Sequence, residues 1–391
     1  MSSPGHHTTA SSHALWALMV GNVVIGTGVM MVPGALNDLS QSLNISIPQA
    51  GQLITAAAIL MGLGAPLFAG IVAGWDRRKL LTLSLVWYGL MTAISALAPS
   101  YAALLPLRVL TVISPAIFTP QAAASVGLMV GPEQRGRAIT FVFLGWSVAS
   151  VMGTPLSAWI AGVFGWRWMF ALVAVAAWVV AAWIWRVMPS GIRPAALTRR
   201  AWGQTLGSPV LMLTLSVTLV YSFGQFTLFS YFAPYLHETL GATSGTIALL
   251  FLWFGAFGLM GNMVLSRTVD RIGAPRAVLV TLALIAVSLL FWPLGRYGFW
   301  PQALIATPWA LGCFASNSAQ QARLVHQSPV LAPATVALNT SAMYGGQALG
   351  AALGGVMIAQ GHLLRLHEVG LGLMLAAMAL SIVAARLQNR S

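Results

Sequence analysis

The feature that most constrains this chain is a series of apolar stretches, each about as long as a bilayer is thick. About twenty residues, rising 1.5 Å each in a helix, cross a hydrocarbon core of roughly 30 Å. Such stretches occupy residues 14–36, 50–73, 80–98, 102–128, 138–163, 166–188, 209–235, 244–268, 275–294, 301–322, 332–359 and 364–386. The sequence therefore predicts an all-α membrane protein of about twelve transmembrane helices.

Composition and charge agree with that prediction. Of the 391 residues, 58% are hydrophobic and 6% are charged, whereas soluble domains carry about 25% charged residues. The net charge of +13 is scattered between apolar stretches, so it indicates membrane topology rather than nucleic-acid binding. The single cysteine, Cys313, excludes an intrachain disulfide.

The basic residues also predict orientation. If both termini are cytoplasmic, fifteen Lys and Arg residues lie on the cytoplasmic side, and only Arg167, Arg296 and Arg365 lie outside. Basic residues near span ends resist translocation. We therefore expect a cytoplasmic tail (1–13), an N-terminal six-helix bundle (14–188), a cytoplasmic linker (189–207), a C-terminal six-helix bundle (208–386) and a short cytoplasmic tail (387–391).

The second half repeats features of the first. A hinge with Asp270 and Arg271 follows the eighth stretch, as Asp76, Arg77 and Arg78 follow the second. Glycine-rich segments occur in both the fifth and the eleventh stretches. Parallel repeats of this kind place a solute site near the membrane midplane, between two pseudo-symmetric bundles.

Two glycine-containing segments and several prolines predict close helix packing or bends. Gly70 and Gly74, four residues apart, are expected on one helix face, where they allow close backbone approach. Gly145, Gly153 and Pro155 in the fifth stretch predict tight packing and a kink. Further prolines in the first, fourth, seventh and tenth stretches predict bends suited to rocking movements, at Pro33, Pro106, Pro115, Pro120, Pro234 and Pro308.

These motifs resemble those of the major facilitator superfamily, in particular its twelve-span drug:proton antiporters and sugar-efflux (arabinose-efflux-like) permeases. The resemblance rests on the hinge Asp76-Arg77-Arg78-Lys79-Leu80-Leu81, the Gly145–Pro155 segment and Gly165-Trp166-Arg167, and it covers nearly all of 14–386. It implies secondary transport with export. Two positions depart from the family pattern, because Gly74 replaces its first hinge aspartate and Val29 replaces its first-span acidic residue.

Arg108 is the strongest single candidate. It lies about two turns into the fourth stretch, where a charge costs about 2.5–3.5 kcal/mol to insert, and such charges usually mark a pathway. It matches the family's fourth-helix arginine, which implies a role in proton or substrate coupling. The alternative is a side chain that extends to the membrane surface.

The resemblance implies a cavity lined by the first and fourth helices of each half. The residues expected there are Asn22, Thr27, Met30, Met31, Arg108, Gln121, Tyr221, Gln225, Tyr231, Trp309, Asn317 and Gln321. Methionine and aromatic side chains with a few amides suit a neutral or amphipathic solute.

The acidic residues limit what coupling is available. All six, Asp38, Asp76, Glu133, Glu238, Asp270 and Glu368, fall at span ends or in loops. Proton antiport in this family usually depends on an embedded carboxylate. Asp38, at the outer mouth of the first span, is the remaining candidate.

No enzyme motif competes with transport. The chain has no phosphate-binding loop, no metal-spaced Cys/His cluster and no paired carboxylates for acid–base chemistry, so we expect no cofactor. The leading prediction is a monomeric secondary carrier that exports a small organic solute (a drug, sugar or amino-acid-like compound) from a bacterium across its inner membrane, by proton-coupled antiport. An uptake carrier or uniporter is the alternative within transport, and a non-transporting receptor is the alternative from another class.

Overall fold

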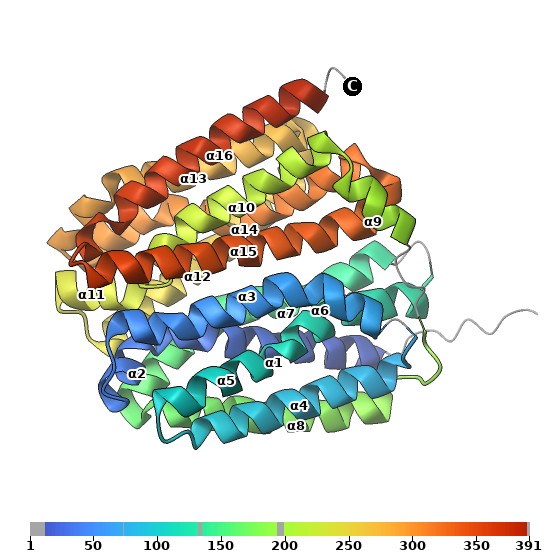
Figure 1. The fold of residues 1–391 in the computed structure, drawn as a ribbon, viewed down its shortest axis with the longest axis horizontal. Coiled ribbons are helices and arrows are strands. Elements are labelled where there is room, and N and C mark those ends of the chain that lie inside the picture. Colours follow the sequence, from blue (N-terminus) through green and yellow to red (C-terminus); the bar gives the residue numbers. More distant parts are fainter. Residues whose placement is uncertain (1–11, 73, 132–134, 194–198, 389–391) are drawn as a thin grey trace, which may run out of the picture.

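The computed structural model describes residues 12–72, 74–131, 135–193 and 199–388, and within these ranges the regular elements are all helical (Figure 1). The first half contains α1 (Ser12–Gly34), α2 (Leu36–Ser42), α3 (Ile47–Ile71), α4 (Arg77–Ala96), α5 (Tyr101–Thr111), α6 (Ile113–Met129), α7 (Arg135–Phe164) and α8 (Trp166–Val187).

The second half follows a short linking helix, α9 (Arg199–Leu206). It contains α10 (Pro209–Phe229), α11 (Phe232–Leu240), α12 (Ser244–Ile272), α13 (Ala274–Phe291), α14 (Phe299–Gln327), α15 (Ala332–Ala359) and α16 (Leu366–Gln388). Three short 3-10 turns connect these helices, at Trp292–Tyr297, Pro329–Leu331 and Leu363–Arg365.

The predicted twelve-span architecture is confirmed. In the described part of the chain, eleven helical segments are long and apolar enough to cross a bilayer. The twelfth span is α14, which has 29 residues but is less apolar because it carries several glutamines, an asparagine and an arginine. Several helices bury small and branched apolar residues against their neighbours and leave large apolar residues exposed on the outer surface, as expected beside lipid.

Two spans are broken where a proline removes a backbone donor. The fourth span is divided into α5 and α6 at Val112, because Pro115 has no N–H to donate to the carbonyl of Thr111. The seventh is divided into α10 and α11 at Ser230 and Tyr231, four and three residues before Pro234. The helices α2 and α9 lie in segments for which the sequence predicted no helix.

The two bundles repeat the same helix pairings. In the first bundle α1 packs on α7, and in the second their counterparts α10 and α15 pack together. The bundles meet along two reciprocal pairs, α3 with α15 and α7 with α12. Figure 1 shows α3 and α15 side by side at the middle of the molecule. This reciprocity is the pseudo-symmetry that the sequence repeats predicted.

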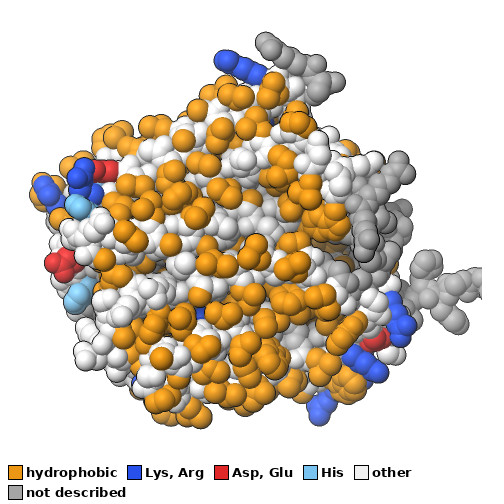
Figure 2. All heavy atoms as spheres, in the orientation of Figure 1, with side chains coloured by type: hydrophobic (Ala, Val, Ile, Leu, Met, Phe, Trp, Pro, Cys, Tyr) orange, Lys and Arg blue, Asp and Glu red, His pale blue; other side chains and the backbone are white. Residues whose placement is uncertain are grey.

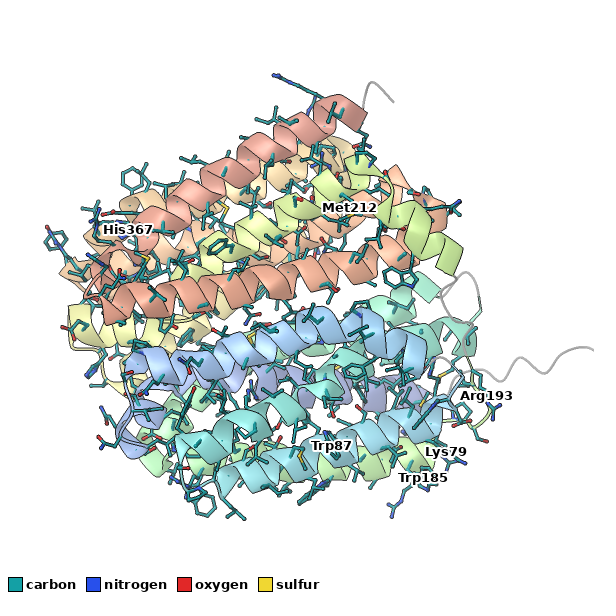
Figure 3. All side chains as sticks on the ribbon, in the orientation of Figure 1. Lys79, Trp87, Trp185, Arg193, Met212 and His367 are labelled. Carbon is teal, nitrogen blue, oxygen red and sulfur yellow. The ribbon has the colours of Figure 1, made fainter. Side chains whose placement is uncertain are left out.

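Charged side chains gather at the two ends of the bundles, and apolar side chains cover the middle (Figure 2). Lys79, Trp185 and Arg193 lie at one end and His367 lies at the other (Figure 3). The basic residues assigned to the cytoplasm in the hinge and after α8 thus share one end of the molecule.

The prediction that Gly70 and Gly74 share a helix face is wrong. Helix α3 ends at Ile71, so Gly74 lies beyond it in the turn before α4. A Cβ added at Gly74 would meet nothing within 4 Å. Gly74 therefore makes no close helix contact, because the charged hinge ends the helix before it.

Candidate translocation site

The candidate site is organised around Arg108, in the last turn of α5. Its side chain is 2% exposed. Nη1 donates to the carbonyl oxygen of Gly28 at 2.9 Å, and Nη2 donates to that of Val29 at 3.1 Å. Arg108 is therefore a buried guanidinium that joins α5 to the C-terminal half of α1.

The carbonyl of Val29 is available because of a proline one turn later. In an α-helix it would accept the N–H of residue 33, but residue 33 is proline and has none. A buried carbonyl without a donor is costly, and Arg108 supplies the donor. One turn earlier, Tyr88 Oη donates to the carbonyl of Ile25 at 3.2 Å.

A small cavity lies beside Arg108 at the junction of the two bundles. Its lining comes from α1, α3, α5 and α15, through Val29, Ile54, Ala57, Ala58, Met61, Arg108, Tyr344 and Gln347. Its volume is about 10 Å³, roughly what one water molecule needs. This space is too small for an organic solute, which can bind beside Arg108 only if the residues that line it move apart.

The cavity contains a positive charge and no negative one among the described residues. Its polar side chains are Arg108, Tyr344 and Gln347, and the other lining residues are apolar. Of the acidic residues, Asp38, Asp76, Glu238 and Glu368 lie in or beside short elements or terminal turns at the ends of the bundles. Glu133 and the side chain of Asp270 lie outside the described residues.

Asp38, the remaining candidate for proton coupling, has a structural role at one end of the molecule. Its Oδ2 accepts the backbone N–H of Trp166 at 2.7 Å, at the first residue of α8. The first N–H groups of a helix have no partner within it, so α2 caps α8. Burial raises the pKa of Asp38, while the Trp166 N–H and the Arg167 charge oppose the increase.

The hinge around Asp76 is attached to the segment that follows α8. Asp76 caps α4 by accepting the Lys79 N–H at 3.2 Å, and it also accepts the Gly191 N–H. The backbone N–H of Arg77 donates to Ile192 at 3.0 Å, and its Nη1 donates to Val72 at 2.8 Å. Desolvation acts to raise the pKa of Asp76, but the hydrogen bonds from Gly191, Lys79 and Arg78 together lower it.

The other hinge residues are more peripheral. The guanidinium of Arg78 lies 4.4 Å from the centre of the Trp185 ring, a favourable cation–π distance. Arg271 is exposed in the last turn of α12. The hinge therefore stabilises one end of the first bundle and does not contact the cavity.

The glycines of the fifth span allow α7 to approach α1. A Cβ added at Gly145 would overlap the carbonyl oxygen of Met19, and one at Gly153 would lie 3.0 Å from the Cα of Thr27. Pro155 lies inside α7, which remains helical through it. Helix packing thus accounts for these residues, and α7 also forms part of the contact with α12.

The remaining predicted residues of the first bundle do not line the cavity. Asn22 is fully buried, donates from Nδ2 to Val142 at 3.1 Å and accepts from Thr119 at 2.9 Å. Met31 is buried in the hydrophobic core and Gln121 is buried, whereas Thr27 and Met30 are partly buried.

Those of the second bundle lie mostly within its own core. Trp309 is fully buried in an aromatic cluster, and its Nε1 lies 3.4 Å from Oε1 of Gln225. Tyr231 donates to the carbonyl of Ala351 at 2.6 Å. Tyr221 is fully buried, Asn317 accepts from Asn339 at 2.9 Å, and Gln321 is partly buried. Of the predicted solute-binding residues, only Arg108 lines this cavity.

Sequence reasoning missed the contribution of α3 and α15. Tyr344, Gln347, Ala57 and Met61 line the cavity because these two helices form one of the contacts between bundles. The glycines of the eleventh span, which correspond to those of the fifth, did indicate that this span packs closely on other helices. They did not indicate which of its faces meets the other bundle.

Two similar six-helix bundles that meet around a central cavity define a multi-pass membrane carrier. Residues 18–234 match the family model described as Major Facilitator Superfamily. The chain is 27% identical over 355 residues to the inner membrane transport protein YdhP of Escherichia coli (strain K12), covering 90% of each chain. It is 29% identical over 343 residues to a chloramphenicol resistance protein of Streptomyces lividans, covering 85% of this chain and 86% of the relative.

A solved structure gives the same fold. A bacterial homolog of the human lysosomal transporter Spinster, in an inward-facing and occupied conformation, has a TM-score of 0.71 at 17% identity, covering 99% of this chain and 98% of the other. This chain belongs to the Major Facilitator Superfamily. It is a secondary transporter, and members of this non-enzyme family bind small-molecule substrates.

Proposed function

We propose that the protein exports a small organic solute from the cytoplasm of a bacterium across the inner membrane, with both termini in the cytoplasm. The cavity beside Arg108 supports the proposal, because it is lined by both bundles and contains a buried charge. The direction of transport is supported by the name of another similar protein, the chloramphenicol efflux pump Rv0191 of Mycobacterium tuberculosis, and the membrane by that of YdhP. The proposed functional unit is a monomer, because one chain supplies both six-helix bundles and the contacts that join them.

Export is tested by retention in cells and vesicles. Cells that express the protein should accumulate less of a transported drug or sugar than cells with the empty membrane, and an Arg108→Gln variant expressed at an equal level shows whether this arginine is required. Right-side-out vesicles should show the same difference. If every tested sugar, amino acid and drug is retained equally with the protein, the variant and the empty membrane, export is wrong.

Orientation is tested by labelling engineered cysteines. Ser190 and Pro99 are exposed, in segments at opposite ends of the first bundle, and the native Cys313 is replaced by serine. With cytoplasmic termini, Ser190→Cys should react with an impermeant maleimide only after the cells are opened, whereas Pro99→Cys should react in intact cells. The reverse pattern would contradict the proposed orientation.

The absence of a described carboxylate from the cavity favours a uniporter as a second candidate mechanism. Proton antiport needs a group that binds and releases a proton along the pathway. A pH-sensitive dye inside vesicles separates the two mechanisms. An antiporter changes the luminal pH when substrate is added, and a uniporter for a solute that carries no proton does not.

A further inference from the structure

The charge on Arg108 has no counter-charge within the described residues. Its hydrogen-bond acceptors are two backbone carbonyls, which are dipoles and carry no net charge. It forms no ion pair with a described carboxylate. A buried charge without an opposite charge is costly. An anion in the cavity would neutralise the charge of Arg108, which water and neutral solutes cannot do.

The guanidinium also retains a free donor. Nε is buried and has no hydrogen-bond partner, while Nη1 and Nη2 are engaged with α1. Arginine presents its donors as a planar fork that matches the oxygen atoms of carboxylate-like groups. The unpartnered Nε is therefore a donor that an oxyanion beside Arg108 can satisfy.

We propose that the transported solute is a small organic anion, with one carboxylate- or sulfonate-like group and an apolar body. The anionic group pairs with Arg108, and the apolar body lies against Ile54, Ala57 and Met61 of the first bundle. Tyr344 and Gln347 of the second bundle hydrogen-bond the solute from the opposite side. This inference rests on the proposed export function and specifies its substrate class.

An anionic solute also explains how export is driven although no carboxylate of the described residues lines the cavity. A bacterial cytoplasm is electrically negative, so each negative charge that leaves moves down the membrane potential. At 100 mV this supports a concentration ratio of about 50-fold at equilibrium. With the anion bound, the charge of Arg108 is neutralised; without it, the site is positive. The potential therefore favours the return of the empty, positively charged site towards the negative cytoplasm.

The chain provides a matched control in Arg323 of α14. It is 1% exposed and has only neutral partners, donating to Oγ and the carbonyl oxygen of Ser381 at 3.0 and 3.3 Å. It does not line the cavity. Replacing Arg323 thus removes a buried guanidinium without changing the charge at the site.

The experiment uses the purified full chain in proteoliposomes and three probes of similar shape: benzenesulfonate, neutral benzenesulfonamide and cationic benzyltrimethylammonium. A potassium gradient with valinomycin sets the potential. Benzenesulfonate should accumulate on the electrically positive side of the membrane. The ratio of its concentrations on the two sides should approach about 50-fold at 100 mV and should invert when the potential is inverted. This equilibrium does not depend on the orientation of the protein in the vesicle.

Three variants test the role of Arg108. Arg108→Gln should weaken benzenesulfonate binding at least tenfold, measured by thermal stabilisation in detergent, while Arg323→Gln retains it. Val29→Glu places a carboxylate in the cavity beside Arg108 and should also abolish anion binding, which keeps the test valid if Arg108→Gln does not fold. Arg108→Lys keeps the charge and should retain potential-dependent transport.

The outcomes separate this inference from the proposed function. Transport of a neutral or cationic solute, unaffected by Arg108→Gln and by the potential, would overturn the anionic substrate and leave export standing. If neither the three probes nor any drug or sugar is transported, both proposals fail. Anion binding that survives both Arg108→Gln and Val29→Glu would place the anion elsewhere and contradict the inference.

Discussion

At the scale of the residue, the same side chain behaves differently at two positions. For Asp38, the loss of solvent on burial raises the pKa by more than the Trp166 N–H and the Arg167 charge lower it, so the net pKa is raised. Asp76 also loses solvent, but three backbone N–H groups outweigh that loss and its pKa is lowered. Folding therefore favours the protonated form of Asp38 and the ionised form of Asp76, although both cap a helix.

This difference predicts a pH effect for Asp38→Asn. Because the folded pKa of Asp38 is raised, its contribution to stability is fully present below the unfolded pKa and is lost as the pH rises through the folded pKa. The asparagine variant carries no charge and can still accept from Trp166. Relative to the wild type, its melting temperature should therefore rise as the pH increases from about 4 towards neutrality, in detergent melts at each pH.

The matched variant is Asp38→Ala, which leaves the Trp166 N–H without its acceptor. It should lose about 1 kcal/mol relative to Asp38→Asn at every pH. Equal stability of the alanine and asparagine variants would show that the cap does not contribute.

At the scale of the helix, the sequence predicted where spans begin and end much better than which faces they present. The length of an apolar stretch can be read from consecutive residues alone, so the twelve spans could be identified directly. The contact between Arg108 and Gly28 joins residues 80 positions apart, and no local pattern encodes it. Trp309 and Tyr231 resembled binding residues because they combine a ring with a polar atom, yet their rings fill helix contacts. The break at Val112 was predictable from Pro115, whereas α2 was not.

The contact between α7 and α12 predicts a cost for Gly255→Leu. A Cβ at Gly255 would lie 2.6 Å from the Cα of Val151, which is backbone and cannot move aside by itself. Forcing the helices apart should destabilise the protein by about 1–3 kcal/mol and lower the transport rate. Melting in detergent and vesicle uptake measure the two effects.

Gly372→Leu is the matched control, because a Cβ at Gly372 meets nothing within 4 Å. It should leave both melting and transport close to the wild type. If Gly255→Leu is equally silent, α7 and α12 are not packed as tightly as described.

At the scale of the whole molecule, the two bundles are related by their contacts as well as by their folds. The second span of each half meets the fifth span of the other, in the pairs α3–α15 and α12–α7. Alternating access by rocking requires these pairs to open at one end while they remain in contact at the other. Near the end that the basic residues assign to the outside, α3 and α15 are in contact, and a Cβ at Gly355 would lie 3.8 Å from the Cα of Pro48.

A reversible cross-link at this end tests the movement. In a Cys313→Ser background, the pair Pro48→Cys and Gly355→Cys is close enough for a disulfide, which needs Cα atoms about 4.4–6.8 Å apart. Oxidation should hold the outer ends of the bundles together and stop transport, and reduction should restore it. Each single cysteine variant should be unaffected by the same treatment, which separates locking from the effect of the substitutions. A cross-linked protein that transports as fast as its reduced form would show that the solute passes without separation of α3 from α15, because the rocking movement needs that end to open once in every cycle.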